Sequence, residues 1–269
     1  MYFKRSKRKL ALFCGAVLAL SVLSACGKEP AHEADTPALP EPDPEAVAPA
    51  EPEYDPAARA AFAQVLRYYK DDLILPDGTQ LPEEIRQYDN IENNTFFIAD
   101  VDADSKEELV LDIIDAPTAG QVCFILGYDS ETGETYVELQ VFCGETFYPG
   151  GIVMVNSSHN QTMSAFWPYA IFRHNAETDL YEVVGNVYAE DREIMESFGD
   201  ANQYHYDADP NNTGTVYFVS GPDNLWSGEP VDIDGYNAWR EQYIPADAER
   251  LYYETLCVTD ENIAAITAA

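Results

Sequence analysis

Between Thr95 and Val219 the chain is a succession of short apolar runs, rich in β-branched and aromatic residues and separated by short polar turns. Strands joined by such turns pair with their neighbours in an antiparallel meander, because a parallel pair needs a long crossover connection. The pattern therefore predicts an α+β fold, in which an antiparallel β-meander sheet carries an N-terminal helix and C-terminal helices packed on it. The expected strands are 95–98, 109–114, 122–128, 136–142, 152–155, 169–173, 181–187, 215–219 and 250–255.

Helical signals lie at the two ends of this strand-rich region. Pro56 suits the first position of a helix, and the helical spacing of apolar residues after it fades near Asp71. Near the C-terminus we expect Asp234 to cap one helix and Thr259 to cap a last one. Residues 55–269 are enough for one core of ordinary size, so we expect a single α+β domain.

The first 25 residues have the pattern of a secretory signal. Five cationic residues precede an uncharged apolar stretch, Leu10 to Leu23, which is short for a membrane span of roughly 20 residues. The stretch ends in Leu23-Ser24-Ala25-Cys26, which resembles the lipobox of bacterial lipoproteins. The resemblance implies that residues 1–25 are removed, that Cys26 receives the lipid, and that the mature chain is anchored to the outer face of a cell membrane.

Residues 26–54 are mostly Glu, Pro and Ala, and we expect them to form a disordered, self-repelling spacer. Without the five cations of the signal, 10 basic residues face 48 acidic ones, a net charge of −38. Such a charge repels phosphate backbones and excludes nucleic acid as a partner, and it repels anionic lipid as well. The lipid must then hold the protein at the membrane. We expect a monomer whose remaining partners are a protein or a glycan.

One acidic stretch predicts a metal site. Asp100, Asp102 and Asp104 alternate along a tight loop, so their carboxylates can converge on one point. The main-chain carbonyl of Lys106 and the carboxylate of Glu108 would complete an oxygen cage of the kind that Ca²⁺ prefers. Without a cation, these carboxylates would repel one another at close range.

The stretch departs from the EF-hand. Ser105 stands where such loops normally have glycine, Leu111 replaces the bidentate glutamate, and the flanking residues are strand-like. The pattern is similar to the shorter D-x-D-x-D-G-x-x-E-L loop set between strands in calcium-binding β-repeats. The alternative interpretation is a solvated acidic turn. A weaker version at 209–217 carries Gly214 in the right place but ends on Tyr217, and we interpret it as a plain turn before a strand.

Several further segments resemble a family of uncharacterised surface lipoproteins of Clostridia-type Gram-positive bacteria. The likeness spans most of the chain, and it implies a location and a cation loop without implying an activity. The segments that carry it are 97–104, 167–172, 179–184, 236–239 and 256–263.

Catalytic motifs are not evident: the chain has no G-x-S-x-G, H-E-x-x-H, P-loop or dinucleotide fingerprint. Ser158 and His159 place a hydroxyl beside a base, but neighbours in a strand point to opposite faces. Cys123, Cys143 and Cys257 allow one disulfide, between Cys123 and Cys143, although we favour free thiols. We therefore expect a non-catalytic binding domain stabilised by Ca²⁺. The alternatives are an extracellular hydrolase with an acidic site and a glycan- or solute-binding lipoprotein.

Overall fold

The computed structural model describes residues 53–83, 90–160, 162–222 and 227–268. Contacts divide the chain after Ala48, and the unit Pro49–Ala269 contains all of these residues. The predicted signal, the predicted lipidation site Cys26 and almost all of the predicted spacer lie outside the described residues.

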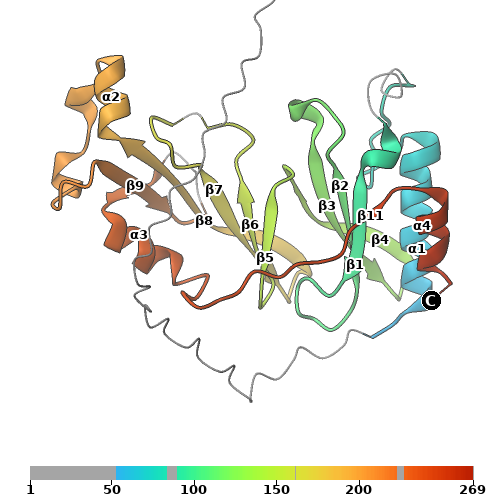
Figure 1. Ribbon diagram of the computed structural model, residues 1–269. Coiled ribbons are helices and arrows are strands. Elements are labelled where there is room, and N and C mark those ends of the chain that lie inside the picture. The colour runs from blue at the N-terminus through green and yellow to red at the C-terminus, as the bar shows by residue number, and fades with distance from the viewer. Residues whose placement is uncertain (1–52, 84–89, 161, 223–226, 269) are drawn as a thin grey trace, which may run out of the picture. The chain divides into compact units, whose positions relative to one another are not determined.

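The strand-rich region forms two antiparallel sheets, which confirms the α+β meander and divides it in two (Figure 1). The first sheet has the strand order β11-β1-β2-β3-β4 and the second has the order β10-β9-β8-β7-β6-β5. The first sheet consists of β1 (Thr95–Ala99), β2 (Glu108–Ile113), β3 (Val122–Asp129), β4 (Glu134–Val141) and β11 (Leu256–Cys257). The second consists of β5 (Glu145–Tyr148), β6 (Ile152–Asn156), β7 (Tyr169–Asn175), β8 (Leu180–Asp191), β9 (Thr215–Ser220) and β10 (Glu229–Val231).

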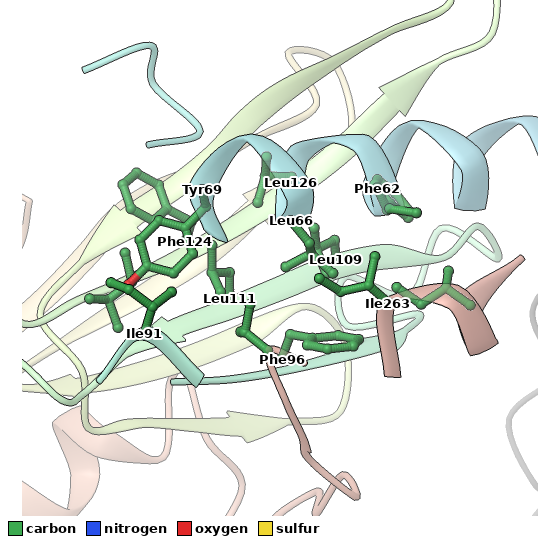
Figure 2. Packing of buried hydrophobic residues seen from close by; sticks show 14 of the residues in the cluster. Phe62, Leu66, Tyr69, Ile91, Phe96, Leu109, Leu111, Phe124, Leu126 and Ile263 are labelled. Atoms are coloured by element: carbon green, nitrogen blue, oxygen red, sulfur yellow. The ribbon is translucent and has the colours of Figure 1, made fainter. Parts of the chain in front are cut away.

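Helices from both ends of the described region cover the outer face of the first sheet. α1 (Pro56–Arg67) begins at the cap residue Asp55 and continues into a π-helical turn, Tyr68–Asp72. α4 (Asp260–Ile266) begins at Thr259, as predicted. Figure 2 shows their apolar side chains lying over the sheet in one buried cluster. It labels Phe62, Leu66 and Tyr69 near α1, Phe96 on β1, Leu109 and Leu111 on β2, Phe124 and Leu126 on β3, together with Ile91 and Ile263.

A second apolar cluster lies between the two sheets. Val110 and Ile125 of the first sheet pack there with Val153 and Val155 of the second. Because strand side chains alternate between faces, Ile152 and Ile171 point to the other side of the second sheet. There they pack with Trp239 of α3 (Ile233–Arg240). The layers are therefore helices, first sheet, second sheet and helix, and the carboxylates described below lie at the layer between the sheets.

Two local predictions needed correction. The cap of α3 is Asp232, which accepts the amide of Gly235 at 2.9 Å, and Asp234 lies inside the first turn. The predicted strand 250–255 is wrong, because only Leu251 pairs, in a single bridge to Phe147. Sequence reasoning also missed β5, β10, β11 and α2 (Arg192–Phe198).

Candidate metal centre

In the loop between β1 and β2, aspartate side chains accept hydrogen bonds from the main-chain amides of the same loop. Asp100 accepts hydrogen bonds from the amides of Ala103 and Ser105, at 2.7 and 3.1 Å. Asp102 Oδ1 accepts one from the amide of Asp104 at 2.8 Å. Ala103 and Ser105 have φ values of 70° and 76°, a left-handed conformation that costs a non-glycine residue roughly 1–2 kcal/mol. Ser105 thus adopts the backbone for which loops of this pattern normally use glycine.

Three of the predicted ligands come together in this loop. Carboxylate oxygens of Asp100, Asp102 and Glu108 all lie within 4.8 Å of one another. Glu108 is the first residue of β2, and its Oε2 accepts the amide of Val101 at 2.9 Å. This hydrogen bond turns the Glu108 side chain back toward the loop, where Asp102 lies.

Asp104 and Lys106 are placed differently from the other predicted ligands. Asp104 groups with Asp102 and with Asp179, a residue that the sequence prediction did not include. Asp104 Oδ2 lies 2.5 Å from the ammonium of Lys106. The prediction assigned Lys106 through its carbonyl, whereas the contacts observed for it use its ammonium and its amide.

The second sheet and β4 bring further groups that sequence reasoning missed. His174 of β7 lies with its Nε2 3.0 Å from Asp102 Oδ2 and 3.2 Å from Asp179 Oδ1. Glu138 of β4 joins Asp102 and His174 in one group within 4.8 Å. Asp179 in turn accepts the hydroxyl of Tyr136 at 2.5 Å. These residues lie far from Asp102 in sequence, so only the pairing of the strands could reveal them.

Burial leaves this cluster electrostatically unsatisfied. Among the described residues, Glu138 Oε2 is buried without a hydrogen-bond partner, and Asp102 Oδ2 is buried with His174 Nε2 3.0 Å away in a geometry that forms no hydrogen bond. Burial raises the pKa of Asp102 to about 6, although the amide of Asp104 opposes the shift. Burial, together with the charge of Asp102, raises the pKa of Glu138 to about 9 and that of Glu108 to about 10. The cluster therefore favours either protons or a bound cation over free carboxylates.

Two glycines allow these groups to approach so closely. A Cβ at Gly127 would lie 2.2 Å from Glu138 Oε1, and one at Gly151 would lie 2.5 Å from the Asp102 carbonyl oxygen. Gly151 also has a φ of 67°, in the turn between β5 and β6. A side chain at either position would displace the carboxylate or the loop that it now contacts.

A cavity opens beside the cluster. Its volume is about 440 Å³, and its lining is acidic and aromatic. The buried carboxyls of Glu108 and Glu138 reach it from the first sheet. It is also lined by Glu53, Tyr54, Asp55, Asp104, Lys106, Glu107, Tyr128 and Tyr136.

The weaker acidic loop has a different structure. Both carboxylate oxygens of Asp209 accept hydrogen bonds, from the hydroxyl of Tyr204, the amide and hydroxyl of Thr213, and the amide of Gly214. The loop leads directly into β9. These bonds close a turn around the carboxylate, and Asp209 is not among the residues that group as candidate metal ligands in the described part of the chain.

Other candidate groups are placed as follows. Ser158 Oγ lies 2.9 Å from His159 Nδ1, in contrast to the expectation that the two side chains point apart, because both follow β6 in a loop. The cysteines Cys123, Cys143 and Cys257 are free. Among the described residues, no helix is long and apolar enough to span a membrane.

We found no match to this chain among protein-family models, curated proteins or solved structures.

Proposed function

We propose that the folded unit is a non-catalytic binding domain that takes up one Ca²⁺ at the carboxylates around Asp102. The observation that carries this proposal is Glu138 Oε2, a buried oxygen that has no hydrogen-bond partner among the described residues and that lies in one group with Asp102. A buried carboxylate without a partner is costly, and a coordinated cation removes that cost. Asp100, Asp102, Glu108 and Glu138 would supply the ligands, with Asp104 and the carbonyl of Lys106 as the further oxygens expected from the sequence.

The chemistry of the donors favours Ca²⁺ over softer ions. Ca²⁺ takes six to eight oxygen ligands at flexible angles, and carboxylates are its usual protein partners. Mg²⁺ demands a tighter octahedral arrangement and retains water. His174 contributes a nitrogen, which Ca²⁺ does not prefer, so we assign it the role of positioning Asp102.

A cation at this point would link the loop between β1 and β2 to another strand of the first sheet, because Asp102 belongs to that loop and Glu138 belongs to β4. With a Kd near 10⁻⁴ M and millimolar Ca²⁺, the bound ion would stabilise the fold by about 1.4 kcal/mol.

A melting experiment tests this site. We expect Ca²⁺ to raise the melting temperature over that in chelator, and we expect Asp102→Asn to abolish the increase. Glu134→Gln is the matched control, because Glu134 is exposed and lies on the same strand as Glu138. An increase that survives Asp102→Asn, or no increase in the unsubstituted protein, would remove the calcium site.

We also propose that the domain is held at the extracytoplasmic face of a bacterial membrane by a lipid on Cys26. The lipobox pattern, the likeness to surface lipoproteins and the charge of the mature chain support this location. Acyl chains contribute about 0.8 kcal/mol for each buried methylene, so a multiply acylated cysteine anchors stably. Expression of the full chain with labelled palmitate should label the protein, and Cys26→Ser should remove both the label and its membrane association. Label retained in Cys26→Ser would contradict the anchor.

The second candidate function is a hydrolase with an acidic site. It is favoured by the position of Glu108 and Glu138, two carboxyl groups that both line the cavity of about 440 Å³. Paired carboxyl groups of this kind carry out glycoside hydrolysis. Release of reducing ends from cell-wall polysaccharides, lost in Glu138→Gln and retained in Glu134→Gln, would favour the hydrolase. The absence of product across such a panel would favour the binding domain.

A further inference from the structure

The face of β2 that points between the sheets carries a second buried carboxylate. Glu108, Val110 and Asp112 alternate onto this face, and Val110 is part of the apolar cluster between the sheets. Asp112 therefore lies four residues beyond Glu108, roughly 13 Å along the strand. It is 8% exposed. Neither the calcium proposal nor the hydrolase alternative uses it.

Sulfur and oxygen ligands meet at Asp112. Atoms of Asp112, Cys123 and Glu145 all lie within 4.8 Å of one another. Cys123 is directly opposite Asp112 in the pairing of β2 with β3, and it is fully buried. Glu145 is the first residue of β5 in the other sheet. Cys143, two residues before Glu145, is half-buried, and its Sγ lies 3.5 Å from the carbonyl oxygen of Ile113.

The site contains an unpartnered polar atom. Asp112 Oδ1 is buried and accepts no hydrogen bond of good geometry among the described residues, although the carboxyl group lies beside the side chains of Cys123 and Glu145. Arg250 lines the neighbouring cavity, but it forms no ion pair with Asp112 or Glu145 in the described part of the chain. A buried carboxylate in this state requires a proton or a cation.

A route from solvent leads to the cluster. Asp112 and Glu145 both line a cavity of about 180 Å³. Tyr252, which also lines it, is 85% exposed, so the cavity reaches the surface there. A hydrated ion could therefore reach the carboxylates without unfolding of the sheet.

We propose that Asp112, Cys123 and Glu145 form a binding site for Zn²⁺ or a similar thiophilic divalent cation. Zn²⁺ is held tetrahedrally by thiolates and carboxylates, and Ca²⁺ has little affinity for sulfur. Binding releases the proton of each thiol that coordinates, so the affinity decreases as the pH falls. The site is distinct from the cluster around Asp102 and does not depend on the calcium proposal.

Cobalt titration tests the site, because a thiolate bound to Co²⁺ gives a near-ultraviolet charge-transfer band. The purified full-length chain is stripped with chelator under reducing conditions and titrated with Co²⁺. We expect a saturable band that Zn²⁺ displaces. The band should disappear in Cys123→Ser and persist in Cys257→Ser, because Cys257 is exposed and lies on β11.

Two further variants separate loss of the site from loss of the fold. Glu145→Gln changes only a half-buried side chain, and it should weaken binding at least about tenfold while the circular dichroism is unchanged. Glu138→Gln should leave the band intact, since Glu138 belongs to the other cluster. The absence of a thiolate band in the unsubstituted protein would overturn the proposal and leave a proton shared between Asp112 and Glu145 as the explanation of the buried pair. A band unaffected by Glu145→Gln would also overturn it.

Discussion

Single carboxylates have opposite roles in the two acidic loops, and the difference lies in their hydrogen-bond partners. Asp209 has hydrogen-bond donors for both oxygens, whereas Asp102 Oδ2 accepts no hydrogen bond among the described residues and has His174 Nε2 3.0 Å away. Burial acts to raise the pKa of Asp209, but the hydrogen bonds from Gly214, Thr213 and Tyr204 outweigh it and lower the pKa. The same residue type is thus stable as an anion in one loop and unstable in the other.

Asp209→Asn should destabilise the protein at neutral pH and have little effect in acid. A group with a lowered pKa contributes stability above its unfolded-state pKa, and this stability is lost as the pH falls through the folded-state value. Hydrogen bonds to a charged group contribute about 1.5–3 kcal/mol, so we expect a loss of that size at pH 7. Urea unfolding at pH 7 and in a series of buffers down to about pH 2, below the unfolded-state pKa of about 3.9, measures it. An equal loss at both ends of this pH range would contradict the role of the charge.

Glu138→Gln should act in opposite directions with and without Ca²⁺. Because burial holds the pKa of Glu138 near 9, folding in chelator at pH 7 requires this group to take up a proton, at a cost of about 3–4 kcal/mol. The amide removes that cost, so the variant should be the more stable protein in chelator. With Ca²⁺ it should lose the cation's stabilisation. Chemical unfolding in both buffers, with Glu134→Gln as control, measures the two signs. A variant that is less stable in chelator would show that Glu138 has a structural partner instead.

At the level of elements, the candidate cation loop is held against α1. Arg59 of α1 donates two hydrogen bonds to Glu107, from Nε at 2.8 Å and from an Nη at 2.6 Å. The amide of Glu53, just before the helix, donates to the carbonyl of Ser105 at 3.0 Å. The start of the folded unit therefore contacts the loop that we propose to bind Ca²⁺.

Arg59→Ala should destabilise the fold and weaken Ca²⁺ binding together. Removal of a partly buried bidentate ion pair leaves Glu107 without its partner, and we expect a loss of about 1–3 kcal/mol. Arg67→Ala is the matched control, because Arg67 lies on the same helix and is exposed. Isothermal titration with Ca²⁺ and urea unfolding give the two readouts. Equal behaviour of the two variants would show that the ion pair does not position the loop.

The element pattern explains which parts of the fold could be predicted. The turns at 129–133 and 175–179 have strong local signals, and the strands that they join were expected nearly where they are. The segment 250–255 is rich in strand-forming residues, but within it only Leu251 pairs, in one bridge to Phe147. Its composition therefore predicted a strand that does not form. Short strands such as β5 and β10 gain their order from pairing with neighbours, which local sequence does not report.

The residues of the candidate site could likewise be predicted only where they are neighbours in sequence. Asp100, Asp102 and Glu108 could be predicted to converge because they belong to one loop. Glu138 and His174 could not, since their approach to Asp102 depends on the strand register and on the packing of the two sheets. The position of Asp112 opposite Cys123 likewise required the register of β2 with β3.

For the molecule as a whole, charge should oppose folding and favour cation binding. The chain carries 48 acidic residues against 15 basic ones, a net charge of −33. Such an excess destabilises the compact state through self-repulsion and concentrates cations near the surface. Salt screens both effects, since the Debye length falls from about 30 Å at 0.01 M to about 8 Å at 0.15 M.

Salt should therefore change stability and Ca²⁺ affinity in opposite directions. In chelator, we expect the melting temperature to rise between about 0.01 and 0.15 M NaCl, because salt over this range screens the repulsion among the acidic residues. Over the same range we expect the Ca²⁺ affinity to fall, because the field that attracts the cation is screened. Calorimetric melting and isothermal titration measure the two trends. In Asp102→Asn the melting temperature should still rise with salt, because that trend depends on the charge of the whole surface. The variant should no longer bind Ca²⁺, because binding depends on the carboxylate cluster around Asp102. A melting temperature that falls as salt is added in chelator would mean that specific ion pairs, such as that of Arg59 with Glu107, outweigh the repulsion among the acidic residues.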